Sequence, residues 1–430
     1  MKKITALLLT ICMLLLSSCA MLDKSSGGSF KGGYASAPEM GADDYSGAPD
    51  TDGTDDGVSD SDNEKVTLPS GMITAAAWND NLYYNDWLAL FAQGEDKDGK
   101  FYHYTVAKES WGYDSLNRID VLVTNADGPV AGAGVVAYDE QGNVSFRAVT
   151  DAQGRAYLFP SAESGSITVT NGDETVSESF SKENRSIELE LVGEENKLNV
   201  IEIMLVLDVT GSMGDEIYFL KAELADVINR IAENDSETVI KLALLFYRDT
   251  DDTVPFDYYD FTDVTTASGL SAQQAALDKQ SAIGGGDYPE AVDTALEMAV
   301  NKQWSTGATT KIIFHVLDAP AHDTDANKQK LVNATERAAE LGIRICPIIC
   351  SGAAGETEYT MREAAVYTGG TFIFVTDDSG IGNSHYDPDL PNATVELLNS
   401  LMVRLVKGYH TGEFDAPIYW RQDPNLAVTE

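Results

Sequence analysis

Three oxygen-bearing side chains, Asp208, Thr210 and Ser212, stand at alternate positions directly after a run of apolar residues. The apolar run begins at Ile201 and an amphipathic run follows, so the three residues occupy a turn from a strand into a helix. They offer only oxygen atoms, which Mg²⁺ prefers, and Mg²⁺ held at about 2.0–2.1 Å usually keeps several waters. The spacing therefore predicts a magnesium site that stays open to a further ligand.

A second aspartate is placed to complete this site. Asp318 follows the run Lys311 to Leu317, which predicts another buried strand. In open α/β sheets, ligands bind outside the carboxyl ends of the strands, where both Asp208 and Asp318 are expected. A carboxylate at the end of a buried strand is costly unless it is paired or metal-bound, and no basic residue lies near Asp208 in the sequence.

These residues resemble a known family. Asp208, Thr210 and Ser212 are similar to the Asp-x-Ser/Thr-x-Ser motif of von Willebrand factor A domains, which builds their metal-ion-dependent adhesion site. Asp318 resembles the strand-end aspartate that these domains supply to the metal, usually through water. The resemblance implies a divalent cation, Mg²⁺ first with Ca²⁺ or Mn²⁺ as alternatives, and a protein partner that completes the metal with an acidic side chain.

The chain departs from the family at the third direct ligand, which is usually a threonine. The segment from Gly284 to Glu290 (GGGDYPE), with Tyr247-Arg-Asp249 upstream, resembles the hemicentin-type branch. Asp287 is the side chain nearest the place of that threonine, and the resemblance carries it over as a metal ligand. The segment is expected to open a helix.

Helix capping is the alternative role for two of these residues. Ser212 with Asp215, and Asp287 with Glu290, are three residues apart. That spacing matches a capping box, in which the side chains bind free backbone N–H groups of the first helical turn.

Two further residues are candidates for an accessory role. His322 lies on the loop after Asp318, and Asp249 follows an apolar run. His315 alternates within its predicted strand, which favours a core histidine. A zinc site made by the two histidines is disfavoured, because zinc prefers nitrogen and sulfur while the other candidates here offer oxygen.

The segment 198–410 has the pattern of a doubly wound, mostly parallel α/β sheet. Its short β-rich runs are nearly continuously apolar, as in strands covered by helices on both faces, and helical periodicity separates them. The predicted strands are Ile201 to Leu207, Val239 to Tyr247, Lys311 to Leu317, Ile343 to Cys350 and Thr371 to Val375.

A different pattern precedes this domain. Residues 117–193 show short alternating runs separated by turn signals, which predict a small all-β sandwich. The run Ala148 to Ala156 resembles carboxypeptidase-regulatory-like or transthyretin-like domains, whose default role is a structural spacer. Residues 66–116 are rich in aromatic side chains, have no assigned role, and are expected to dock against a neighbouring domain.

The N-terminus indicates export. Residues 1–18 pair two lysines with an apolar run too short to cross a bilayer of about 30 Å, as in a signal peptide. Cys19 matches the cysteine of a bacterial lipobox, so it is expected to carry lipid and anchor the chain to the cell envelope. Residues 19–65 are rich in Gly, Ser and Asp, which predicts a flexible acidic tether, and residues 411–430 are expected to form a C-terminal tail.

Charge and cysteine content exclude some functions. The 430 residues carry 69 acidic and 29 basic side chains, a net charge of −40 that disfavours nucleic-acid binding. Cys346 and Cys350 lie four positions apart on one predicted strand, about 13 Å at the usual rise per residue, so they are expected to be buried thiols without a disulfide.

We therefore expect a surface-anchored bacterial lipoprotein that is not an enzyme and binds a protein partner through a divalent cation. The sequence has no Gly-x-Ser-x-Gly, His-Glu-x-x-His or phosphate-loop motif. The alternative is a metal-dependent hydrolase in which the same cation activates water and His322 or Asp249 acts as base.

Overall fold

The computed structural model describes residues 72–92, 104–193, 198–233, 237–379, 390 and 393–426. The predicted signal peptide, Cys19 and the acidic tether lie outside the described residues, as do the last four residues of the tail.

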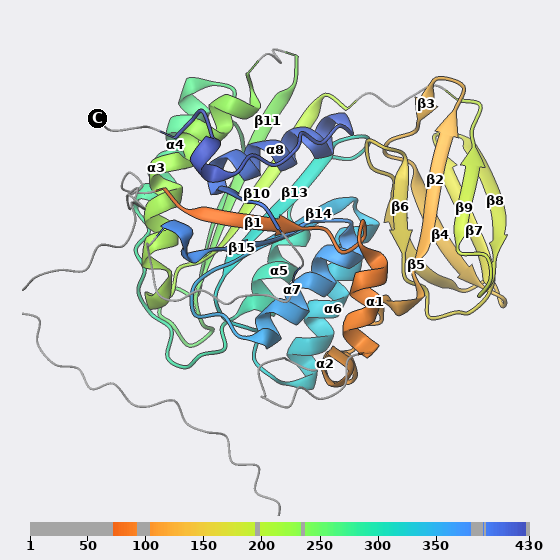
Figure 1. The fold of residues 1–430 in the computed structure, drawn as a ribbon, viewed down its shortest axis with the longest axis horizontal. Helices are drawn as coiled ribbons and strands as arrows, with labels where there is room; N and C mark the ends of the chain where they lie inside the picture. Colours follow the sequence, from red (N-terminus) through yellow and green to blue (C-terminus); the bar gives the residue numbers. More distant parts are fainter. Residues whose placement is uncertain are drawn as a thin grey trace, which may run out of the picture. The chain divides into compact units, whose positions relative to one another are not determined.

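The central element is an eight-stranded sheet (Figure 1). In spatial order its strands are β12 (Phe256–Asp263), β11 (Val239–Tyr247), β10 (Val200–Asp208), β13 (Thr310–Leu317), β14 (Ile343–Ile349), β15 (Phe372–Val375), β1 (Thr74–Trp78) and β16 (Val395–Leu397). The five strands from β11 to β15 are mutually parallel, whereas β12 and β1 are antiparallel to their neighbours. The predicted mostly parallel α/β sheet is confirmed.

Helices cover both faces of this sheet, which explains why its central strands are apolar without alternation (Figure 1). One face packs with α3 (Gly214–Ile231), α4 (Ala267–Asp278) and α8 (Leu398–Thr411). The other packs with α5 (Val292–Val300), α6 (Asp325–Glu340) and α7 (Gly355–Thr368). Along β10, Ile203 and Leu205 belong to the first core, and Met204 and Val206 to the second.

Three strands of the sheet were not predicted: β12, β1 and β16. The aromatic segment supplies β1, whose residues Ala75 to Trp78 pair with β15 and whose residues Thr74 to Ala76 pair with β16. The same segment forms α1 (Tyr84–Ala92) and α2 (Tyr104–Trp111); α1 packs against α2, and α2 packs against α7. The described residues also form four short 3₁₀ helices: Ser115–Asn117, Gly211–Met213, Asp377–Ser379 and Trp420–Gln422.

Residues 119–190, for which the alternating runs predict a small all-β sandwich, form two four-stranded sheets. One holds β3 (Gly128–Pro129), β2 (Ile119–Asn125), β6 (Arg155–Leu158) and β9 (Ser186–Glu190); the other holds β5 (Val144–Val149), β4 (Gly134–Asp139), β7 (Gly165–Asn171) and β8 (Glu174–Phe180). Alternate side chains of β2 and β4, such as Val121 and Val135, are fully buried in a shared core. The result is a small sandwich beside the α/β sheet.

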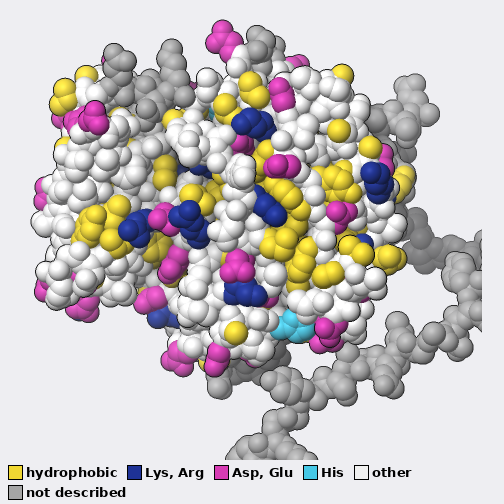
Figure 2. Space-filling view, turned by 180° about the vertical axis from the view of Figure 1, so that it is seen from behind, with side chains coloured by type: hydrophobic (Ala, Val, Ile, Leu, Met, Phe, Trp, Pro, Cys, Tyr) yellow, Lys and Arg dark blue, Asp and Glu magenta, His cyan; other side chains and the backbone are white. Residues whose placement is uncertain are grey.

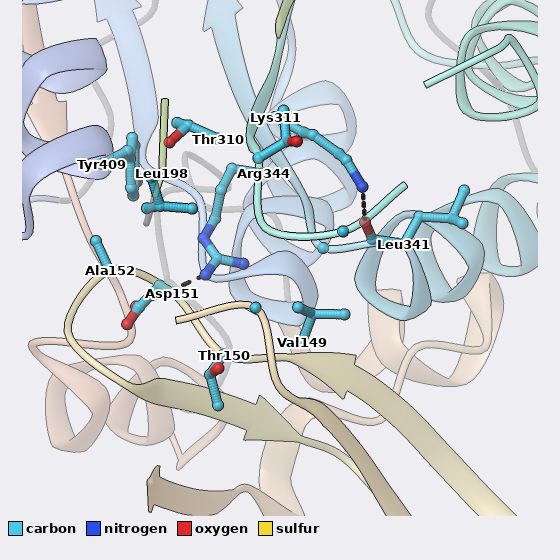
Figure 3. Close-up of a pocket in the computed structure, with 14 residues that line it drawn as sticks. Val149, Thr150, Asp151, Ala152, Leu198, Thr310, Lys311, Leu341, Arg344 and Tyr409 are labelled. Carbon is cyan, nitrogen blue, oxygen red and sulfur yellow. Dashed lines mark hydrogen bonds and ion pairs between the residues drawn. The ribbon is translucent and has the colours of Figure 1, made fainter. Parts of the chain in front are cut away.

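The sandwich contacts the edge of the α/β sheet where the parallel strands begin. A cavity of about 30 Å³ lies at this junction. Figure 3 shows Asp151 of the sandwich beside Arg344 of the sheet, with Lys311 also at the cavity. Arg344 lies 3.7 Å from Asp151, and the Lys311 ammonium donates to the Leu341 carbonyl at 3.0 Å. The cavity has room for little more than a water molecule, and its cations already have partners, so it is a packing junction rather than a ligand site.

The surface carries charged side chains of both signs, and the two cysteines of the described residues lie in the core. On the face in Figure 2, acidic side chains are scattered among Lys and Arg side chains, while hydrophobic side chains gather in a band. Cys346 and Cys350 are buried free thiols, as predicted. Within the described ranges, no helix combines the length and the apolar character needed to cross a membrane.

Candidate metal centre

The carboxyl ends of β10 and β13 bring the predicted aspartates to one edge of the sheet. β10 ends at Asp208, and β13, its neighbour, places Val316 opposite Leu207, so that Asp318 emerges beside Asp208. This edge lies opposite the sandwich junction along the strands, because Lys311 at the junction stands at the start of β13.

Asp208 is fully buried, and only one of its two carboxylate oxygens has a hydrogen-bond donor among the described residues. The Thr210 backbone N–H and hydroxyl donate to Oδ1 at 2.9 and 2.7 Å, whereas Oδ2 accepts no hydrogen bond. Arg248 is the nearby cation, but its guanidinium donates to the backbone carbonyls of Ile283 and Val254 at 2.8 and 3.2 Å. The Asp208 carboxylate therefore lacks the partner that a buried charge requires.

Ser212 and Asp318 complete the predicted group. Ser212 is exposed, and its hydroxyl forms a hydrogen bond with the Asp318 carboxylate. Asp318 itself is 5% exposed. Asp318 thus lies with the three residues of the Asp208 turn, with Ser212 on the solvent side and Asp208 inside.

The capping interpretation is wrong for both pairs. Helix α3 begins at Gly214 with Met213 as its N-cap, and α5 begins at Val292 with Ala291 as its N-cap, in each case without a side-chain capping hydrogen bond. The segment from Gly284 to Glu290 is irregular and leads into α5, which begins at Val292. The Glu290 backbone forms an isolated bridge with Ala321.

Glu290, for which the sequence spacing predicted only a capping role, lies at the same edge of the sheet as Asp208. A Cβ added to Gly285 would stand 2.7 Å from Glu290 Oε1 and 3.2 Å from Thr210 Cβ, so the carboxylate lies beside the predicted site. Gly285 has a φ of +76°, a backbone conformation that side chains disfavour. Glu290 is 4% exposed, and its Oε2 has no hydrogen-bond partner in the described part of the chain.

Asp287 belongs to a different group. Asp287 is exposed, and its carboxylate lies near the carboxylate of Asp249 and the imidazole ring of His322. One ligand atom from each of the three residues lies within 4.8 Å of the other two. His322 Nε2 is 2.8 Å from Asp249 Oδ1. The structure thus brings the two accessory candidates to Asp287 and sets Glu290 beside Asp208.

Burial and mutual repulsion perturb the carboxylates at this edge. Burial raises the pKa of Asp208 to about 7 and that of Glu290 to about 9, and the neighbouring acidic groups add to both shifts. Burial also raises the pKa of Asp318, against the opposing hydrogen bond from Ser212, and it raises the pKa of Glu216 on the first turn of α3. A positive charge at this edge would reduce the repulsion between these carboxylates.

His315 takes no part in this edge. It is fully buried, its Nε2 lies 3.2 Å from the Tyr247 hydroxyl, and burial lowers its pKa to about 3. It is a neutral core histidine, as its place in the strand predicted.

The donor set fits a hard cation. Asp208 Oδ2 and Glu290 Oε2 are buried oxygens without hydrogen-bond partners in the part of the chain that the structure describes. The Thr210 and Ser212 hydroxyls and the Asp318 carboxylate add only oxygen. Soft metals, which prefer thiolate sulfur, fit this set poorly.

Residues 202–377 match the family model described as von Willebrand factor A domain. The chain contains a von Willebrand factor A domain. The matched range runs from β10 to the residues after β15, so it includes the α/β sheet from β12 to β15 and all five residues at the metal edge. No curated protein sequence matches the chain.

Solved structures resemble the A domain only distantly. The conserved hypothetical protein BatB from Bacteroides thetaiotaomicron is 15% identical over 49% of this chain and 86% of its own, with a TM-score of 0.27. The pilus adhesin SpaC from Lactobacillus rhamnosus GG is 11% identical over 57% and 36%, with a TM-score of 0.30. Proximal thread matrix protein 1 from the mussel byssus is 14% identical over 52% and 54%, with a TM-score of 0.34. This chain therefore spans about half or less of the last two proteins.

Proposed function

We propose that the A domain binds a protein partner through a divalent cation, with Mg²⁺ as the first candidate and Ca²⁺ or Mn²⁺ as alternatives. Asp208, Thr210, Ser212 and Asp318 would hold the cation, and Glu290 would take the place first given to Asp287. The observation that carries the proposal is Asp208 Oδ2, a fully buried carboxylate oxygen without a hydrogen-bond donor in the described chain. When bound, the cation would neutralise this charge and offer an open coordination position to an acidic side chain of the partner.

The surroundings of the edge support recognition of a partner with apolar side chains beside its acidic group. Ile283 is 61% exposed, and its backbone N–H donates to the Val209 carbonyl at 3.1 Å, directly after Asp208. Tyr288 is 46% exposed, and its hydroxyl donates to the Asp318 carbonyl at 3.2 Å. Two exposed apolar side chains therefore flank the carboxylates, and such side chains contribute strongly to protein interfaces.

The cation is tested by calorimetry of the purified full chain with Mg²⁺. Asp208→Ala should abolish binding, and Glu290→Gln should weaken it by at least about tenfold, since each removes a buried charge next to the ion. Asp287→Asn, the matched control from the neighbouring group, should change the affinity by less than about threefold, because screening weakens exposed charges. Undiminished Mg²⁺ binding in the Asp208→Ala variant would show that the site lies elsewhere.

The proposal includes anchoring to a bacterial cell envelope and display at the surface. Cys19 would carry the lipid, residues 19–65 would serve as a tether, and the sandwich would act as a spacer. Metabolic labelling with a fatty acid tests the anchor: label should appear in the natural chain and disappear in Cys19→Ser, and label that persists in the serine variant excludes this cysteine.

Metal-dependent hydrolysis is the second candidate. It is favoured by one contact, the 2.8 Å pair of His322 Nε2 and Asp249 Oδ1, because a histidine oriented by a carboxylate can act as a general base. Mg²⁺-dependent turnover of a chromogenic ester, lost in His322→Gln, would favour hydrolysis over binding. We expect no turnover.

A further inference from the structure

A second group of metal-ligating side chains lies beside the proposed Mg²⁺ site, and each member comes from a different loop. Asp249 follows β11, Asp287 precedes α5, and His322 follows β13. One ligand atom from each lies within 4.8 Å of the other two. Three loops that end separate elements therefore converge on one point.

Glu290 of the first site also indicates that positive charge is missing in this region. The residue is 4% exposed, and its Oε2 has no hydrogen-bond partner among the described residues. Burial raises its pKa most, and the charges of Asp208, Asp249, Asp252 and Asp318 add to the shift, so carboxylates of both groups act on it. Its backbone N–H donates to the Pro320 carbonyl at 3.0 Å, and its bridge to Ala321 holds the loop that carries His322.

The donor chemistry of this group differs from that of the Asp208 edge. His322 adds an imidazole nitrogen, whereas the Asp208 edge offers only oxygen. Imidazole with two carboxylates suits Zn²⁺ and other first-row transition metals, while all-oxygen sites suit Mg²⁺ and Ca²⁺. The side chains of Asp249 and His322 are 10% and 27% exposed, so the group is accessible from one side.

We propose that Asp249, Asp287 and His322 form a second, separate metal site that takes a transition-metal dication, Zn²⁺ first. None of these three residues is assigned to Mg²⁺, but the argument from Glu290 rests on the proposed function, because Glu290 belongs to the first site. Asp249 Oδ1 also accepts a hydrogen bond from the Thr250 backbone N–H at 2.7 Å, which fixes the carboxylate as outer contacts fix metal ligands. With three protein ligands, the ion keeps an open position.

Zinc titration of the full chain carrying Asp208→Asn tests this site without interference from the oxygen-only site. We expect that adding His322→Gln weakens Zn²⁺ binding by at least about tenfold, the smallest loss seen when even an outer partner of a metal ligand is removed. His410→Gln is the matched control, because His410 contacts Thr238 and Thr310 at the far end of the sheet. Asp323→Asn controls for the charge, since Asp323 is adjacent to His322 but 63% exposed.

Pulsed electron paramagnetic resonance gives a second readout. Mn²⁺ bound to the Asp208→Asn chain should show coupling to a nitrogen nucleus, and His322→Gln should remove it. Zinc affinity that is equal with and without His322, or a bound Mn²⁺ without nitrogen coupling, would overturn the proposal and leave His322 and Asp249 as an ion pair. Loss of Mg²⁺ binding in Asp208→Asn bears only on the first site, so the two proposals fail separately.

Discussion

Two groups of buried carboxylates in this protein have opposite surroundings. Around α7, Arg362 donates to both Asp80 carboxylate oxygens at 2.6 and 2.9 Å and to Glu358 at 2.8 Å, and all three residues are at most 3% exposed. At the carboxyl ends of the strands, Asp208 and Glu290 are equally buried, yet each has an oxygen without any partner in the described chain.

The comparison separates charges that the chain balances by itself from charges that it leaves unbalanced. Burying a carboxylate costs several kcal/mol, on the order that a bidentate arginine can offset. At α7 the arginine donates its hydrogen bonds to the buried carboxylates. At the strand ends the nearby Arg248 instead donates its hydrogen bonds to backbone carbonyls. The charges of the α7 group are therefore balanced within the chain, whereas those of the strand-end group match the cation site that we propose.

The largest effect is expected when the balanced group is broken. Arg362→Met leaves Asp80 and Glu358 buried without a cation, and removal of one partner from a buried ion pair costs about 3–5 kcal/mol. Urea denaturation followed by tryptophan fluorescence measures it. Arg337→Met is the control: its pair with Glu340 is exposed, and such pairs contribute about 0–1 kcal/mol. Equal effects of both changes would contradict the distinction.

A smaller effect distinguishes the two groups with the same chemical change. In a chelator, Asp80→Asn should destabilise the protein by about 1.5–3 kcal/mol, the range for hydrogen bonds to charged groups. Asp208→Asn should leave stability unchanged or raise it, because it removes a buried charge that lacks a partner. Adding Mg²⁺ should stabilise the natural chain but not Asp208→Asn. A large loss of stability from Asp208→Asn in the chelator would show that the carboxylate is balanced within the chain.

The smallest effect is a dependence on pH. The pKa values of Asp208 and Glu290 are raised in the folded state, from 3.8 to about 7 and from 4.5 to about 9. The folded state then holds protons that the unfolded state releases, so their contribution to stability is present below about pH 4 and is lost as pH rises to about 9. With a chelator present, the midpoint temperature of thermal unfolding should fall as the pH is raised from about 5.5 to about 9. Saturating Mg²⁺ should reduce that fall.

Glu363 provides an internal standard for this measurement. It is fully buried in α7, and burial raises its pKa to about 8, so it contributes a fall in stability over an overlapping pH range. Because it lies in the α7 region, Mg²⁺ should not change its contribution. Glu363→Gln should therefore reduce the fall with and without Mg²⁺, whereas Glu290→Gln should reduce it only in the chelator. A fall that Mg²⁺ leaves untouched in every variant would contradict the assignment.

The sequence alone determined the features that repeat locally. Continuous apolar runs predicted five parallel strands within one or two residues of their ends, and the spacing of Asp208, Thr210 and Ser212 predicted their common turn. These predictions succeeded because adjacent residues on one strand or turn have fixed relative positions, whatever the rest of the chain does.

Tertiary structure alone decided the partners that come from distant parts of the chain. The short run Thr74 to Trp78 contains three alanines and gave no strong strand signal, yet it pairs with residues about 300 positions away. Asp287 and Glu290 have a capping-box spacing, so local pattern could not tell which one faces Asp208. The bridge of Glu290 to Ala321 and the left-handed backbone of Gly285 decide it, because they aim one carboxylate inward and leave the other at the surface with His322.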